Sequence, residues 1–423
     1  MNTTPETTVQ FIALAIFVVA LCHTFATKLF ERLSHRFPRH SGMFHLLGEV
    51  EVVFGFWAIV LVFVLAFMQG GAQALSYAES RNYTEPLFVF VVMVMAASRP
   101  VLRTVRATVD SIARLAPVST PLASAWLGLA AVPLLGSLIT EPAAMTIAAL
   151  MLAPTIFRPN MPEPLKYLAI GVLFVNVSIG GTMTSYAAPP VLMVAATWQW
   201  DSTFMFINFG WKSAVAVMVN ATVATFVMRK HLRANLEITA VASSQAAVPV
   251  AVVLVHLGLL AAVVLFAHHP VAFIGLFLMF LGFTQAYEEH QSPLIIKEAL
   301  LVGFFLAGLV VLGGLQGWWL QPIVESLEPL ALFFGALGLT AITDNAALTY
   351  LGSLIVGISD ESKYMLVAGA VAGGGLTVIA NAPNPAGVAL LKRGFADESI
   401  GAGGLFFGAL GPTAVAAAAL LFL

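Results

Sequence analysis

Long apolar runs separated by short polar stretches make up most of this 423-residue chain. A helix needs about 20 mostly apolar residues to cross a bilayer. Ten runs reach or approach that length, the third being the shortest: 9–29, 46–69, 86–98, 165–197, 203–228, 248–267, 270–287, 295–314, 364–391 and 402–423. Two further apolar segments, 120–157 and 329–358, each carry a short polar motif near the centre. The pattern predicts an all-α polytopic membrane protein.

Composition narrows the class of protein further. Hydrophobic residues make up 60% of the chain and charged residues 9%, whereas a soluble domain carries about 25% charged residues. The lipid bilayer is therefore the expected partner, and a net charge of −2 without a basic tract gives no support for nucleic acid. The single cysteine, Cys22, excludes an intrachain disulfide. No nucleophile–base pair, metal motif or cofactor motif points to an enzyme.

Basic residues alternate between the loops and so predict an orientation. Lysine and arginine favour short cytoplasmic loops, and they gather in alternate loops, except that the loop 288–297 is nearly neutral and gives no indication. The basic residues are Lys28, Arg32, Arg36, Arg39; Arg99, Arg103, Arg106, Arg114; Arg158, Lys166; Arg229, Lys230, Arg233; and Lys392, Arg393. The remaining loops carry few basic residues, which predicts that both termini face outward. Arg99, Arg103 and Arg106 follow at spacings of four and three, which indicates an interfacial cytoplasmic helix that touches anionic headgroups.

A carboxylate stands in the middle of each of the two interrupted apolar segments. The first motif, ITEPAAMT, covers Ile139–Thr146 and contains Glu141; the second, AITDNAALT, covers Ala341–Thr349 and contains Asp344. An acid inside a membrane segment is costly and by default indicates function. Two such acids at matching places in one chain are typical of a transporter built from a structural repeat.

The two halves of the chain share the same order of segments: three spans, a motif segment, an interrupted span and a final span. The interruptions also match, since Gly180, Gly181, Thr182, Met183 and Thr184 correspond to Gly373, Gly374, Gly375, Leu376 and Thr377, each run followed by proline. We therefore predict two inverted repeats of five spans each, 1–228 and 248–423, joined by a cytoplasmic linker, 229–247. The alternative is chance similarity between low-complexity apolar sequences.

The motif segments have two interpretations. Each forms either two short full spans with the acid in the turn between them, or a re-entrant helical hairpin whose tip stops near the middle of the membrane. The apolar arms of 120–157 are about 19 and 16 residues long, which is short for two crossings. Irregular backbone at membrane depth is tolerated where it is buried in protein or lines a cavity. Both arguments favour hairpins that face the glycine-broken helices 165–197 and 364–391.

This arrangement predicts an ion site. Helix ends leave amides and carbonyls without partners inside the helix, and glycine allows the broken helices to unwind. Freed carbonyls, together with threonine and serine hydroxyls, are ligands that suit a hard cation. We expect Na⁺ where Thr343, Asp344 and Asn345 meet Gly373–Thr377, or at the counterpart around Glu141.

The motifs resemble those of the ion transporter superfamily. That group includes sodium/proton antiporters of the NhaD type, arsenite-efflux permeases and sodium-coupled divalent-anion carriers. ITEPAA and ITDNAA, with SIGGTMTSYAAPP and GGGLTVIANAPNP, are most similar to its bacterial sodium/proton antiporters. The resemblance covers roughly 120–200 and 329–392 by motif, and the rest by topology alone. It implies a homodimer in the bacterial inner membrane and ion sites at Thr140, Glu141, Asp344, Asn345 and the broken-helix residues, namely Gly180, Gly181, Thr182, Thr184, Gly373, Gly374, Gly375, Thr377 and Asn381.

Antiport is the mechanism that the two acids favour. Removal of a carboxylate from water favours its protonated form, whereas a bound cation favours the ionised form. Protons and Na⁺ would therefore compete for Glu141 and Asp344, without any cofactor. The alternative is a sodium-coupled symporter of a small anion, such as bicarbonate or a carboxylate, held by helix N-termini and by the amides of Asn381 and Asn384.

Further polar residues in the apolar runs have two interpretations each. Asn176 is a helix–helix hydrogen-bonding residue or an ion ligand, and Ser185 and Asn384 extend the set of candidate ligands. Lys212 either pairs with Glu141 or extends its stem toward the interface. His256 is either a pH sensor or a buried neutral histidine.

Overall fold

The computed structural model describes residues 5–233 and 248–423, which form helices and no strands. The helices of the first half begin and end as follows: α1 (Pro5–Arg36), α2 (Ser41–Gly48), α3 (Val50–Gln69), α4 (Gly71–Glu79), α5 (Thr84–Ala96), α6 (Arg99–Leu115), α7 (Thr120–Leu129), α8 (Ala131–Ile139), α9 (Glu141–Leu152), α10 (Glu163–Gly180), α11 (Pro189–Trp198), α12 (Ser202–Met205) and α13 (Trp211–Arg233). A π-helical turn, η3 (Phe206–Gly210), connects α12 to α13.

The second half of the chain also contains both long and short helices. Its helices are α14 (Val250–Leu265), α15 (Pro270–Ala286), α16 (Ile296–Gly313), α17 (Gly317–Glu325), α18 (Pro329–Thr340), α19 (Asn345–Ser353), α20 (Asp360–Gly373), α21 (Asn384–Leu391) and α22 (Ala402–Phe422). Short 3₁₀ turns fill several connections: η1 (Pro38–His40), η2 (Gly181–Met183), η4 (Glu288–His290), η5 (Val378–Ala380), η6 (Lys392–Gly394) and η7 (Ala396–Glu398).

Six helical stretches among the described residues are long and apolar enough to cross a membrane: Thr7–Thr24, Glu51–Gln69, Glu163–Met183, Ser202–Leu232, Ile296–Gly313 and Ala402–Phe422. The number rises to eight if α5 with α6 and α7 with α8 each count as one span, although these pairs bend by 64° and 42°. The protein is therefore an all-helical polytopic membrane protein. Its shorter apolar helices include α9, α11, α14, α15 and α18.

One predicted boundary is wrong: the run 46–69 does not form one helix, because α2 ends at Gly48 and Glu49 has extended backbone before α3 begins. The first arm of 120–157 bends at Ala130 between α7 and α8. α13 continues to Arg233, into the segment predicted as the linker, 229–247. The remainder of that linker, 234–247, lies outside the described residues.

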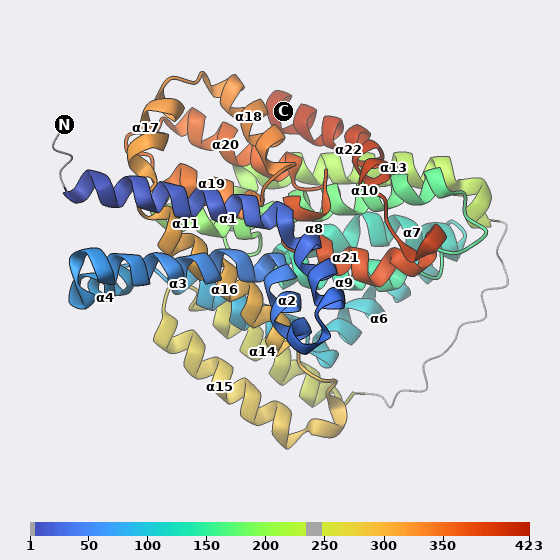
Figure 1. Cartoon of the computed structure of the whole chain (residues 1–423). Coiled ribbons are helices and arrows are strands. Elements are labelled where there is room, and N and C mark those ends of the chain that lie inside the picture. The colour runs from blue at the N-terminus through green and yellow to red at the C-terminus, as the bar shows by residue number, and fades with distance from the viewer. Residues whose placement is uncertain (1–4, 234–247) are drawn as a thin grey trace.

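Helices from the two halves of the chain pack against each other (Figure 1). α16 packs against α3 and α5, α10 against α22, and α11 against α19. Within the second half, α14 packs against α15 and α18 against α20. Glycines allow the closest crossings: a Cβ at Gly308 would overlap the backbone of Gly55, and one at Gly171 would overlap the backbone of Gly408.

Candidate functional site

The first motif forms a one-residue turn between two helices. In this first helix pair, α8 ends at Ile139, Thr140 has a φ of 79°, and α9 begins at Glu141. A positive φ is unusual for a residue with a side chain and often marks a functional turn. The turn lets Gly136 approach Ala144 closely, since a Cβ at Gly136 would lie 3.2 Å from that of Ala144.

The second motif forms a longer turn that is capped differently. In this second helix pair, α18 ends at Thr340 and α19 begins at Asn345. Asp344 is the N-cap of α19, and its Oδ1 accepts hydrogen bonds from the backbone N–H groups of Ala346 and Ala347 at 2.8 and 3.2 Å. Thr343 Oγ1 donates to the Leu339 carbonyl at 2.9 Å. In sequence, Glu141 of the first motif aligns with Asp344 of the second. In the structure, Glu141 corresponds to Asn345, because each of these two residues is the first of its helix.

The broken helices place their interruptions beside these two turns. α10 ends at Gly180 and α11 begins at Pro189, which leaves residues 181–188 as the first break. α20 ends at Gly373 and α21 begins at Asn384, which leaves residues 374–383 as the second break. Both helices thus end at the first glycine of their glycine runs.

Glu141 joins the first helix pair to both breaks. Its side chain is fully buried, and its Oε2 accepts a hydrogen bond from Asn381 Nδ2 in the second break at 2.8 Å. A Cβ on Gly181 in the first break would lie 2.6 Å from Glu141 Oε1. Glycine is therefore required at residue 181 for this close approach of the backbone to the carboxylate.

Asn345 of the second helix pair contacts the second break and α10, the helix that precedes the first break. Asn345 is fully buried, and its Nδ2 lies 3.5 Å from Ser178 Oγ, which itself donates to the Val371 carbonyl at 2.8 Å. A Cβ on Gly374 would lie 2.9 Å from Asn345 Nδ2. The second site thus mirrors the first with an amide in place of a carboxylate.

Hydroxyl groups fasten each break to its own helix pair. Thr184 Oγ1 donates to the Ser137 carbonyl at 2.7 Å, and Ser137 Oγ donates to the Gly180 carbonyl at 2.7 Å. In the second half, Thr377 Oγ1 donates to the Ala341 carbonyl at 2.8 Å. Thr182 Oγ1 shares a hydrogen bond with Ser213 of α13 at 2.9 Å, so Thr182 fixes the first break to a neighbouring helix.

The helix pairs and the second break contain buried side-chain oxygens without a hydrogen-bond partner. Five belong to these segments and a sixth to Asn384, the first residue of α21: Thr140 Oγ1, Glu141 Oε1, Thr340 Oγ1, Asn345 Oδ1, Asn381 Oδ1 and Asn384 Oδ1. A buried polar atom without a partner is rare and calls for a ligand or another explanation.

The orientation of the asparagine amides follows from their partners. Asn384 Nδ2 donates to the Gly374 and Thr377 carbonyls at 2.8 and 2.9 Å, and a carbonyl can only accept. An ionised Glu141 likewise only accepts, so Nδ2 of Asn381 must face it. The Oδ1 atoms of both residues consequently remain as acceptors that a cation can use.

Carboxylates in the described structure do not form a multi-acid metal cluster. No group of three or more His, Cys, Asp or Glu side chains there could hold a metal ion. Besides the carboxylate of Glu141, the side-chain oxygens without partners in this part of the chain belong to hydroxyl and amide groups. Such a mostly neutral set of oxygen ligands suits a hard cation.

Asn176 uses both amide hydrogens and its carbonyl oxygen in hydrogen bonds to other helices. Its Nδ2 donates to the Leu129 and Val217 carbonyls, and its Oδ1 accepts from Asn220 at 3.0 Å. Asn220 also donates to the Pro412 carbonyl at 3.2 Å. These contacts assign Asn176 to packing between helices.

Lys212, His256 and Ser185 form hydrogen bonds with residues other than Glu141 and Asn345. Lys212 Nζ donates to the hydroxyl of Tyr364 at 2.9 Å, and it forms none of the ion pairs found among the described residues. His256 is buried between the Val252 carbonyl and Gln291. Ser185 bonds Ser202 at 3.2 Å.

Sequence reasoning missed several residues that shape the site. Ser178 and Ser137 orient the breaks. Ser213 shares a hydrogen bond with Thr182, and Tyr364 accepts one from Lys212. Ser178 lies two residues before Gly180 within an apolar run, and Ser137 lies two residues before the first motif, which were the only local signals for them. Ser213 and Tyr364 stand far from either motif in sequence, so only the fold reveals them.

Comparison with known proteins gives a family. A family model described as "Putative Na+/H+ antiporter" matches residues 8–423. The solved structure of the YdaH transporter from Alcanivorax borkumensis is similar at 16% sequence identity, with a TM-score of 0.44, and the similarity covers 88% of this chain and 96% of that one. The search of curated proteins finds no match.

Proposed function

This chain belongs to the Na⁺/H⁺ antiporter family that its sequence matches along almost its whole length, and from that premise we propose that it exchanges Na⁺ for protons at Glu141. The observation that supports this most is one fully buried carboxylate, Glu141, whose Oε1 has no hydrogen-bond partner and whose Oε2 accepts from Asn381, a residue with a buried Oδ1 that also has no partner. Na⁺ binds ionised Glu141 together with Asn381 Oδ1 and Thr140 Oγ1. A proton on Glu141 removes the negative charge and releases the cation.

In this proposal, residues around the second helix pair provide further ligands. Asp344 keeps one carboxylate oxygen for the N-cap of α19 and offers the other to an ion or a proton. The side-chain oxygens of Asn345 and Asn384 supply neutral ligands. In this proposal Glu141 and Asp344 both exchange protons, and the exchange moves two protons per Na⁺.

The architecture that we propose for this exchange is a pair of inverted repeats, 1–228 and 248–423. The helix pairs α8–α9 and α18–α19 are re-entrant hairpins, which reach the breaks from opposite sides of a bacterial inner membrane. Alternating access then exposes the ion site first to one side of the membrane and then to the other. Two copies of the chain form the transporting unit, with both termini outside, and no cofactor is needed.

Proton flux in everted vesicles tests the antiport proposal. We expect Na⁺ or Li⁺ to trigger proton movement without an organic solute, and Glu141→Gln to abolish it because an amide cannot exchange a proton. Asp344→Asn tests whether the second carboxylate also exchanges a proton. Normal exchange in both variants would exclude the two-carboxylate mechanism, and flux that requires added bicarbonate or a carboxylate would establish anion symport instead.

A further inference from the structure

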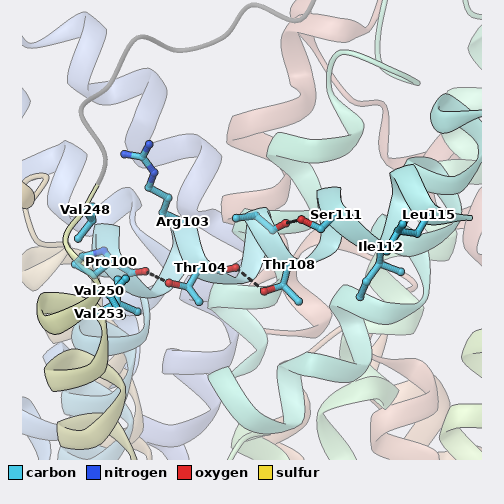
Figure 2. Close-up of a pocket in the computed structure, with 11 residues that line it drawn as sticks. Pro100, Arg103, Thr104, Thr108, Ser111, Ile112, Leu115, Val248, Val250 and Val253 are labelled. Carbon is cyan, nitrogen blue, oxygen red and sulfur yellow. Dashed lines mark hydrogen bonds between the residues drawn. The ribbon is translucent and has the colours of Figure 1, made fainter.

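A groove of about 600 Å³ runs along α6 and the start of α14, apart from the ion site. Figure 2 shows Val248, Val250 and Val253 at one end of it and Ile112 and Leu115 at the other. This volume falls within the usual range of ligand pockets. Two of the apolar side chains that line it are largely exposed: Leu115 is 85% exposed and Val250 72%. Such surface requires an apolar environment or an apolar ligand.

The hydroxyl groups in the groove are already satisfied by their own helix. Thr104 Oγ1 donates to the Pro100 carbonyl, Thr108 Oγ1 to the Thr104 carbonyl and Ser111 Oγ to the Ala107 carbonyl, at 2.7, 2.9 and 2.7 Å (Figure 2). These side chains therefore do not offer their protons to a ligand. The groove suits a hydrocarbon chain better than a polar solute.

The charge of α6 is strongly positive beside this apolar groove. The helix carries Arg99, Arg103, Arg106 and Arg114 against one acid, Asp110, and the Arg106–Asp110 pair is 3.9 Å apart and exposed. Arg103 also lines the groove. α6 bends by 64° from α5, so it departs from the direction of the apolar helix that precedes it. A basic helix on an apolar surface is the arrangement that holds anionic lipid headgroups.

We propose that this groove binds an anionic phospholipid, with one acyl chain between α6 and α14 and the phosphate beside Arg103. The acyl chain covers Ile112, Leu115 and Val250. The arginines of α6 supply the preference for a negatively charged headgroup. The site is separate from Glu141 and does not depend on the transported ion.

Binding of a fluorescent-tail phosphatidylglycerol to the purified full-length chain in detergent tests this proposal. One arginine near an anionic surface contributes about 1 kcal/mol, or about fivefold in affinity, so Arg103→Gln should weaken binding about fivefold. Arg114→Gln is the matched control, since it removes one charge from the same helix outside the groove. Phosphatidylcholine with the same tails should bind more weakly than phosphatidylglycerol.

A second pair of variants separates the groove from general surface charge. Thr108→Trp fills the groove and should remove saturable binding. Thr108→Cys on a Cys22→Ser background, alkylated with a bulky reagent after purification, should do the same in a chain that has already folded. Undiminished binding in both, or equal affinity for the two lipids, overturns the proposal. So does efficient disulfide formation between two Thr108→Cys chains, because the groove would then be an interface between copies.

Discussion

Glu141 and Asn345 occupy equivalent places in the two halves, and they differ in one property that matters for exchange. Each is the first residue of its helix, is fully buried and lies against the glycine break of its own half. A carboxylate can release a proton, whereas an amide cannot. The two sites are therefore similar in shape but not in chemistry, and single substitutions can separate these contributions.

Gly181→Ala should weaken Na⁺ binding while the protein stays folded. The added Cβ would lie 2.6 Å from Glu141 Oε1 and 2.8 Å from its Cγ, so the carboxylate must move away from Asn381. Overpacking of this kind costs about 1–3 kcal/mol, and we expect the Na⁺ concentration for half-maximal flux to rise about tenfold. Gly258→Ala is the control, because a Cβ there meets nothing within 4 Å. Equal half-saturation in both variants would contradict the assigned site.

Asp344 has a structural role that must be separated from ion binding. Asparagine caps a helix about as well as aspartate, whereas alanine costs about 1 kcal/mol. We therefore expect Asp344→Asn to keep the melting temperature and to lose exchange, and Asp344→Ala to lose both. The measurements are thermal unfolding of the purified chain and proton flux. Full exchange in Asp344→Asn would reduce Asp344 to an N-cap.

At the scale of elements, hydrogen bonds from threonine fix the position of each break. Thr184 bonds the Ser137 carbonyl of α8, and Thr377 bonds the Ala341 carbonyl after α18. Both bonds link two elements, unlike the hydroxyl bonds within one helix that are common elsewhere in the chain. The breaks therefore depend on the helix pairs for their shape.

Thr377→Val should destabilise the chain and impair exchange together. The substitution leaves the Ala341 carbonyl without this donor, and loss of one such hydrogen bond costs about 1 kcal/mol. Thr225→Val is the matched control, since Thr225 donates only to carbonyls of its own helix. A melting temperature that falls no more than in the control would show that this bond does not hold the second break.

The sequence predicted the elements better than the contacts between them. Apolar length and the glycine runs placed helix ends at Gly180 and Gly373, because these signals act locally. The bond between Glu141 and Asn381 joins residues 240 positions apart, and no local pattern encodes such a pairing. Alignment of the motifs by residue type also paired Glu141 with Asp344, whereas capping shifts the equivalence to Asn345.

At the scale of the whole molecule, helices from both halves of the chain pack against each other (Figure 1). α3 and α5 pack against α16, and α10 packs against α22. The proposed inverted repeat adds that the two halves cross the membrane in opposite directions, and the basic loops predict the direction for each half.

Cysteine labelling with a membrane-impermeant maleimide tests the inverted orientation directly. On a Cys22→Ser background, we expect Gln73→Cys and Glu328→Cys to react in intact cells, because the loops before α5 and α18 are predicted to be outside. Lys230→Cys and Arg393→Cys should react only after the membrane is opened. All four residues are exposed, so a failure to react reflects the membrane and not burial in the protein. Reaction of Lys230→Cys in intact cells would overturn the predicted orientation of both halves, and protection of Glu328→Cys alone would leave the first half as predicted but remove the inversion.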